Sequence, residues 1–188
     1  MVSSRTVEQL DETVALIEAD GGRAAACVAD VRRPTAVEAL LAETERVLGP
    51  VSVLVNNAGA GGAAAGPFET LDFAGVEETI ANNLLSAMLC TRVVLPGMLE
   101  RGSGRVVNVA SGAGIVGQPF MNAYSVAKAG LIRFSENLAL ELDGRGVTVF
   151  AITPGMVHTD ATDGIWQIRN TSPVPEWLAQ ATTPPHEN

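Results

Sequence analysis

Two side chains capable of acid–base chemistry stand four residues apart in the segment 123–130, AYSVAKAG. Tyr124 is the only tyrosine of the 188-residue chain, and Lys128 is its only lysine. Positions i and i+4 share one face of a helix, so a helix here brings the two side chains together. A phenol has an ordinary pKa of about 10, too high for efficient proton transfer at neutral pH, and a neighbouring ammonium favours the phenolate. The spacing predicts an acid–base pair; the alternative is an exposed helix that carries a lysine for no chemical reason.

Ser111 stands at a second position suited to chemistry. It follows the apolar segment 105–110, RVVNVA, which is typical of a buried strand. In parallel α/β proteins, ligands bind beyond the carboxyl ends of the strands. The Ser111 hydroxyl is therefore expected to reach the ligand crevice, where it could hydrogen-bond a carbonyl oxygen.

Three glycines after this strand have the spacing of a dinucleotide-binding motif: Gly112, Gly114 and Gly117. That motif requires a helix to begin at the third glycine, so that its N–H groups face a pyrophosphate. Here Pro119 intervenes, and the acidic residue expected about 20 positions later at the end of a second strand is absent. We interpret the glycines as a flexible loop rather than as a phosphate site.

Helical and strand-like segments alternate along the chain. Helices are expected from residue 7 to Gly21-Gly22, at 34–48, at about 72–99 (with Pro96 as a point where it could bend) and at 122–142. Apolar segments expected to be strands lie at 24–29, 51–55, 105–110 and 147–152. Apolar strands separated by helices indicate an α/β fold, with a parallel sheet covered on both faces. After Pro154 the pattern fades, and no second domain is expected.

The composition argues against several classes of function. The formal net charge of −9 and the lack of a basic cluster are the reverse of a nucleic-acid-binding pattern. No segment has the features of a signal peptide or of a membrane span. Cys27 and Cys90 lie in apolar segments and are expected to be buried free thiols, which fits a cytoplasmic protein. We expect no metal centre.

The set Ser111, Tyr124 and Lys128 resembles the Ser–Tyr–x–x–x–Lys set of the short-chain dehydrogenase/reductase family. Other segments resemble family motifs in the right order: AD at 29–30, NNAG at 56–59, NNLLSAM at 82–88, VVNVAS at 106–111 and PGMVHT at 154–159. The resemblance covers about residues 1–160, and we assign 161–188 to a substrate-loop region and an irregular tail. It implies one incomplete Rossmann-like domain over 1–188.

The resemblance implies a catalytic role for four side chains. Tyr124 would give a proton to the developing alkoxide, or remove one from an alcohol in the reverse direction. Lys128 would stabilise the phenolate and hold the nicotinamide ribose, and Ser111 would polarise the carbonyl. Asn83 would anchor a water next to Lys128, or could simply bond helix backbone. Asn108 is expected to tie strands together rather than to act in catalysis.

The resemblance also implies a nicotinamide cofactor, and the residues at the chain start bear on which one. Ser4 and Arg5 stand where NAD-preferring members have an acid, and Arg suits a 2′-phosphate, so NADP is expected over NAD. The alternative is a solvated Arg in a turn. The other expected cofactor contacts are Asp30, Val31, Asn57, Ala58, Gly59, Tyr124, Lys128, Pro154, Gly155, Val157 and Thr159.

The expected substrate lining is mostly apolar, which favours a fatty-acyl, polyketide or steroid-like carbonyl; a 3-oxoacyl thioester is the first hypothesis. The lining residues are Ile115, Val116, Phe120, Met121, Ile165 and Trp166. The helices at 72–99 and 122–142 match the family's dimer-forming helices. A homodimer or homotetramer is therefore expected, with no nucleic-acid or membrane partner.

The chain departs from the family pattern at both ends. The family's first strand, with its Thr-Gly-x-x-x-Gly-x-Gly phosphate loop, and its last strand have no counterpart in residues 1–188. Because the first strand is central in the family order 3-2-1-4-5-6-7, strands 2 and 3 should lose their link to strand 4. Two hypotheses follow: these residues are part of an active oxidoreductase, or they form an inactive fragment or interaction module. In either case we expect residues 1–188 alone to bind NADP(H) poorly.

Overall fold

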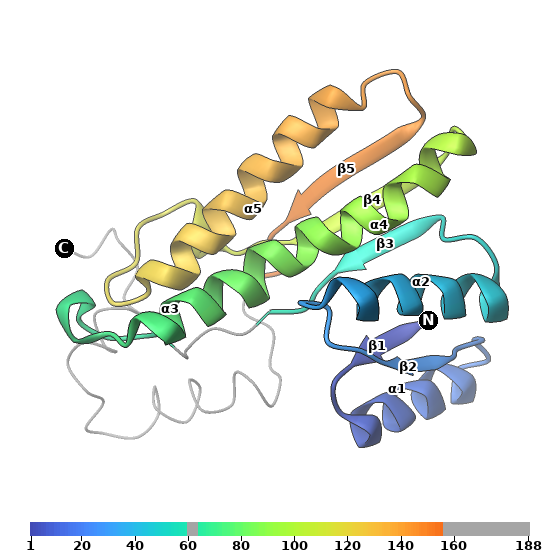
Figure 1. Cartoon of the computed structure of the whole chain (residues 1–188), viewed down its shortest axis with the longest axis horizontal. Helices are drawn as coiled ribbons and strands as arrows, with labels where there is room; N and C mark the ends of the chain where they lie inside the picture. The colour runs from blue at the N-terminus through green and yellow to red at the C-terminus, as the bar shows by residue number, and fades with distance from the viewer. Residues whose placement is uncertain (60–63, 156–188) are drawn as a thin grey trace.

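The computed structural model describes residues 1–59 and 64–155, which form two parallel sheets with helices beside them (Figure 1). The smaller sheet pairs β1 (Val2–Ser4) with β2 (Ala26–Val28). The larger sheet has the order β3 (Val53–Asn56), β4 (Gly104–Val109), β5 (Val147–Ile152), and both of its pairings are parallel. The predicted α/β fold with a parallel arrangement of strands is confirmed.

The helices occupy the segments that hydrophobic periodicity predicted. They are α1 (Val7–Ala19), α2 (Pro34–Leu48), α3 (Phe73–Ile80), α4 (Ser86–Glu100) and α5 (Asn122–Glu141). The segment predicted as one helix over 72–99 contains a π-helical stretch, η2 (Ala81–Leu85), between α3 and α4. The irregular turn thus lies well before Pro96, which stands inside α4. No helix in the described residues is long and apolar enough to cross a bilayer.

The largest hydrophobic cluster joins one face of the three-stranded sheet to α4 and α5. Met98 from α4, Val106 from β4 and Leu142, the C-cap residue of α5, are almost completely buried in it. Leu41 of α2 packs against the same cluster from the side of β3. This cluster fixes α5 relative to the end of β4, where the predicted catalytic side chains lie.

Apolar side chains of the outer strands are exposed on the opposite face of this sheet. Val53 is 48% exposed, Val55 56%, Phe150 48% and Ile152 44%. The described helices α4 and α5 pack on the other face. Strands with this apolar composition are typical of parallel sheets that are covered on both faces.

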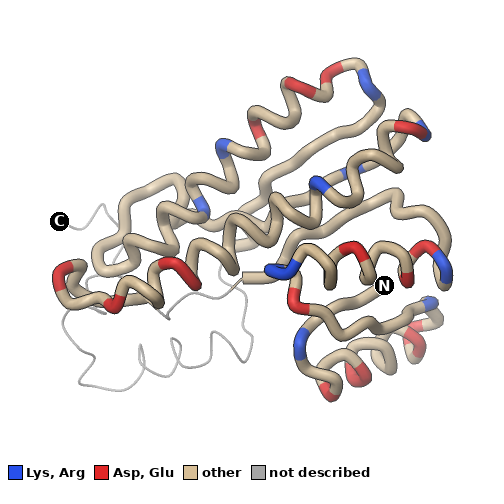
Figure 2. The backbone as a smooth tube through the Cα atoms, viewed as in Figure 1, with Lys and Arg blue, Asp and Glu red and all other residues tan. Residues whose placement is uncertain are grey.

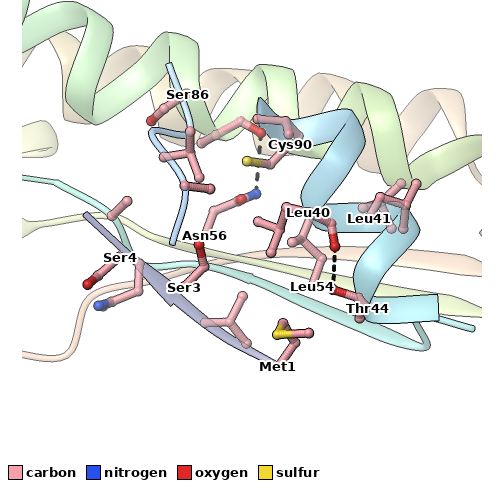
Figure 3. Close-up of a pocket in the computed structure, with 18 of the residues that line it drawn as sticks. Met1, Ser3, Ser4, Leu40, Leu41, Thr44, Leu54, Asn56, Ser86 and Cys90 are labelled. Carbon is pink, nitrogen blue, oxygen red and sulfur yellow. Dashed lines mark hydrogen bonds between the residues drawn. The ribbon is translucent and has the colours of Figure 1, made fainter. Parts of the chain in front are cut away.

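The two sheets do not pair with each other, as predicted from the missing central strand. In β1, Val2 N–H donates to Ala25 O and Ser4 O accepts from Ala29 N–H, so the backbone of Ser3 faces away from β2. Ser3 lines a cavity of about 850 Å³, which Leu54 of β3 lines as well (Figure 3). Val53 and Val55 of β3 also belong to its lining. Unpaired strand edges thus border both sides of this gap.

Candidate active site

Helix α5 holds Tyr124 and Lys128 on one face, as their spacing predicted. The helix begins at Asn122, and Ala123, Ala127 and Leu131 bury its inner face against the rest of the molecule. The Lys128 Nζ atom lies 5.7 Å from the centroid of the Tyr124 ring. Within the described residues, basic side chains are otherwise scattered singly or in small groups along the chain (Figure 2).

Lys128 is buried, which is unusual for a lysine. Its Nζ donates a 2.8 Å hydrogen bond to the carbonyl oxygen of Val109, the last residue of β4. Burial lowers the pKa of Lys128, because desolvation disfavours the charged ammonium. A strand end and a helix face therefore fix this cation in one place.

Ser111 follows Val109 by two residues and begins the turn after β4. It is the N-cap of the short helix η3 (Gly112–Gly114), and its Oγ accepts a 3.3 Å hydrogen bond from Ala113 N–H. The hydroxyl is half-buried. The chain thus passes from the carbonyl that holds Lys128 directly to the Ser111 side chain, at the carboxyl end of the sheet where ligands bind in this class of fold.

Asn83 lies in the π-helical stretch and is almost fully buried. Its Nδ2 donates a 2.9 Å hydrogen bond to Thr79 O, so the alternative of bonding helix backbone is realised for this atom. Its Oδ1 is directed at Gly59: a Cβ atom at residue 59 would lie 2.6 Å from Asn83 Oδ1 and 3.4 Å from Lys128 Nζ. The segment NNAG, the π-helical turn and α5 therefore meet around Lys128.

A buried polar network braces the strand ends behind this site. Asn56 Nδ2 donates to Asn108 Oδ1 at 2.8 Å and to Thr91 Oγ1 at 3.0 Å, and Asn108 Nδ2 donates to Ser135 Oγ at 2.8 Å. Asn108 ties strands and helix together, as predicted. Asn56 was missed. The signal in the sequence was a polar residue at the end of an apolar strand. The structure pairs this residue in register with Asn108.

The residues predicted to contact the adenosine end of a cofactor line the cavity between the two sheets. They are Ser4, Arg5, Asp30, Val31, Asn57, Ala58 and Gly59. The Ser4 hydroxyl is engaged in its own turn, since its Oγ donates to Thr6 O and accepts from Thr6 N–H, each at 3.0 Å. Arg5 is exposed at the same wall. Seven residues that are distant in sequence are thus brought together.

Arg32 was not predicted and orders this wall. Its guanidinium donates to both carboxylate oxygens of Asp30, at 2.7 and 2.8 Å, and to Glu78 of α3 at 3.2 Å. This pairing holds the pKa of the Asp30 carboxyl well below its usual range. The signal in the sequence was weak, because Asp30-Val31-Arg32-Arg33 resembles any charged turn before a helix.

For the remaining predicted residues, the structure gives only the position in the chain and the exposure, or they lie outside the described residues. Ile115 and Val116 are exposed, Met121 is the N-cap of α5, and Phe120 has a positive φ of 65°. Pro154 and Gly155 follow β5 and are exposed. Val157, Thr159, Ile165 and Trp166 lie outside the described residues.

The glycine motif at 112–117 does not open an α-helix. Gly112–Gly114 form the short helix η3, and the next α-helix begins only at Asn122. The geometry that makes such a motif bind pyrophosphate is therefore missing here, as predicted. The residues present fit the adenosine and nicotinamide-ribose ends of a dinucleotide. In the described part of the chain, no glycine-rich helix start faces the cavity to hold the pyrophosphate between them.

Comparisons with known proteins agree with this arrangement. Residues 1–170 match the family described as short chain dehydrogenase, and the chain belongs to this family. It is 42% identical over 154 residues to the ketoacyl reductase HetN of Nostoc, covering 82% of this chain and 53% of that protein. It is 37% identical over 171 residues to a 3-oxoacyl-(acyl-carrier-protein) reductase of Synechocystis, covering 91% of this chain and 67% of that protein.

A solved structure extends the agreement to three dimensions. The actinorhodin polyketide ketoreductase variant F189W, crystallised with NADPH, matches with a TM-score of 0.86 at 36% sequence identity. The match covers 95% of this chain and 69% of that one. The chain thus spans about half to two thirds of the length of these relatives, and the predicted Rossmann-like fold is confirmed.

Proposed function

We propose that these residues belong to an NAD(P)-dependent oxidoreductase that interconverts a ketone, such as a 3-oxoacyl group, and a secondary alcohol. The observation that carries the proposal is the placement of Lys128: a buried ammonium held by Val109 O beside the ring of Tyr124. Burying a cation without a charged partner costs free energy, and such a group in an α/β protein is a candidate for a functional site. Stabilising a phenolate that exchanges protons with substrate is a function that such a cation can serve.

Each side chain then has a chemical role. In reduction, Tyr124 Oη gives its proton to the carbonyl oxygen of the substrate, and in oxidation it takes the proton back. Lys128 stabilises the phenolate by charge, and Ser111 Oγ–H donates a hydrogen bond to the same carbonyl oxygen. Asn83 and Gly59 bound the pocket around Lys128. The nicotinamide cofactor supplies the hydride when it is bound.

NADP is proposed as the preferred cofactor. Arg5 is exposed at the cavity wall, and its guanidinium can bind a 2′-phosphate through charge-assisted hydrogen bonds. The Ser4 hydroxyl, by contrast, is engaged in its own turn. The polyketide ketoreductase with a similar fold was crystallised with NADPH, which supports the same choice.

The substrate proposal is a 3-oxoacyl thioester. It is supported by exposed apolar side chains at Ile115 and Val116, beside the proposed carbonyl site, and by the relatives described as ketoacyl and 3-oxoacyl reductases. A sugar substrate would require several polar contacts that this part of the loop does not offer.

Self-association and a cytoplasmic location complete the proposal. Large apolar side chains are exposed on the outer helices, at Phe73 (65%), Val126 (62%) and Leu140 (78%), which favours a dimer or tetramer. Light scattering after gel filtration should give twice or four times the monomer mass. Both cysteines are free, and Cys90 is buried as expected, whereas Cys27 is only half-buried because it lies in the short two-stranded sheet. Burial raises the pKa of the Cys90 thiol to about 11, so that it stays protonated and unreactive.

The test is NADPH-dependent reduction of acetoacetyl-coenzyme A by the full-length polypeptide that contains these residues, and by its Tyr124→Phe variant. We expect kcat of the variant to fall by about 10²- to 10⁴-fold with NADPH affinity unchanged, because only the proton donor is lost. Near-normal turnover by the variant would remove Tyr124 from the mechanism. Reduction of acetoacetyl-coenzyme A at a rate far below that of a simple ketone would overturn the thioester assignment.

A second hypothesis, an inactive fragment or interaction module, is favoured by one observation: the unpaired edges of β1 and β3 that border the cavity. Wild-type protein that neither binds NADPH nor reduces a carbonyl substrate would support it.

A further inference from the structure

Gly114 packs directly on the backbone of α5 at the position of Lys128. A Cβ atom at residue 114 would lie 2.7 Å from Ala129 N, 2.7 Å from Lys128 C and 2.9 Å from Lys128 O. Carbon atoms do not approach backbone this closely, and a helix backbone cannot move aside as a side chain can. Gly114 is not among the residues with positive φ, so the requirement for glycine here is one of space alone.

The other two glycines of the same motif differ from Gly114. A Cβ atom added at Gly112 or at Gly117 would meet nothing within 4 Å. The spacing that resembles a phosphate motif therefore includes one position with a packing requirement and two without. This difference gives matched control positions within a single loop.

The contact at Gly114 is one of the points at which the chain leaving β4 touches α5. Another is the hydrogen bond from Lys128 Nζ to the oxygen of Val109, the last residue of β4. Ser111 lies between the two points in sequence, and its turn is closed by hydrogen bonds from Gly114 N–H to Ser111 O at 3.0 Å and from Ala113 N–H to Ser111 Oγ at 3.3 Å. A shift of Gly114 must therefore be transmitted to Ser111.

We propose that Gly114 is a positioning residue, which sets the distance between the Ser111 hydroxyl and the Tyr124–Lys128 face of α5. The proposal rests on the proposed function, because it assigns the consequence of the contact to carbonyl reduction. Tyr124 and Lys128 share one helix and keep their relation to each other when the loop moves. Ser111 alone is displaced, so the hydrogen bond to the substrate oxygen is weakened while cofactor contacts are kept.

The test compares Gly114→Ala with Gly112→Ala and Gly117→Ala in the full-length polypeptide, using acetoacetyl-coenzyme A and NADPH. We expect kcat of Gly114→Ala to fall about 10- to 100-fold, since small displacements of a catalytic group cost this much. Its dissociation constant for NADPH should stay within about twofold of wild type. The two control variants should stay within about twofold in both quantities.

Amide hydrogen exchange reports on the packing of Gly114 against α5 and does not depend on enzymatic turnover. In Gly114→Ala, exchange should rise over residues 110–117 and stay unchanged over 128–141, and neither control variant should show the rise. An absence of turnover in wild type would contradict the proposed function, while the exchange measurement would still report the packing.

Three results would overturn the inference. One is a Gly114→Ala variant that is folded by circular dichroism at 10 °C and retains wild-type kcat. Another is a loss of NADPH affinity as large as the loss of kcat. The third is a variant that does not fold even at 10 °C, because Gly114 would then serve folding rather than the placement of Ser111.

Discussion

The two halves of the described chain differ in how completely they build their share of the site. The half formed by β3, β4, β5, α4 and α5 has a continuous hydrophobic core around Met98, Val106 and Leu142, and it fixes Lys128 through contacts made within itself. The half formed by β1, α1 and β2 buries much less, with Leu10 of α1 and Ala29 after β2 as its most buried apolar residues. The geometry of the proposed catalytic site is therefore self-contained, whereas the proposed adenosine wall depends on what fills the gap between the sheets.

The two proposed sites differ in how much they depend on a strand between the two described sheets. A site whose residues lie on one helix and the adjacent strand end needs only local packing. A cavity wall assembled from two sheets keeps its residues, but its shape depends on the strand between them. Substitutions in the two halves should therefore differ in their effects on folding and on cofactor binding.

The largest effect on stability is expected from substitutions in the hydrophobic cores of the two halves. Met98→Ala should lower the free energy of unfolding by about 2–5 kcal/mol, because a fully buried side chain is removed from the cluster that supports α5. Leu10→Ala removes a buried side chain of the smaller half. Hydrogen exchange should rise across β4, β5 and α5 in the first variant and only across β1, α1 and β2 in the second. An equal rise in both halves for both variants would show that they unfold as one unit.

A smaller effect is expected at the adenosine wall. Arg5→Ala in the full-length polypeptide should raise KM for NADPH about tenfold and leave KM for NADH nearly unchanged, because a charge-assisted contact to the 2′-phosphate is lost. Arg92→Ala is the matched control, since Arg92 is exposed on α4 away from the cavity lining. Equal changes in KM for the two cofactors would show that Arg5 does not read the phosphate.

The smallest effect concerns Lys128 and pH. Burial lowers the pKa of Lys128 below its ordinary value of 10.5, so the unfolded chain holds this proton at pH values where the folded protein has released it. The free energy of unfolding should therefore gain a contribution that grows with pH through the window below 10.5. Lys128→Met should lack this contribution.

Arg133→Met is the control for this pH dependence, because Arg133 is an exposed cation on the same helix. It should keep the wild-type pH dependence in denaturant titrations at several alkaline pH values. The same pH dependence in wild type and Lys128→Met would mean that Lys128 is solvated in the folded protein.

Much of this architecture could be predicted because it follows from local patterns. The spacing of Tyr124 and Lys128 placed them on one helix face, and apolar segments placed the strands to within a few residues. The separation of the sheets followed from the family's strand order. The rest depends on tertiary packing. The approach of Asn83 to Gly59 and the hydrogen bond of Arg32 to Glu78 join residues that are distant in sequence, and only the fold brings these residues together.

The glycine motif at 112–117 also shows that tertiary packing cannot be predicted from local sequence. Its spacing alone suggested a phosphate site, and the position of Pro119 correctly argued against one, since no helix begins at Gly117. The reason for glycine at residue 114 could not be read from the sequence, because it is the backbone of α5 that passes within contact distance.

We propose that residues 1–188 contain the catalytic set but only part of the cofactor site. The most direct measurement is a fluorescence titration of NADPH with residues 1–188 alone, alongside the full-length polypeptide that contains them. We predict weak or undetectable binding by residues 1–188, because no glycine-rich helix start in the described residues faces the cavity. Micromolar binding by residues 1–188 together with carbonyl reduction would contradict the account, and would return phosphate binding to Gly112, Gly114 and Gly117.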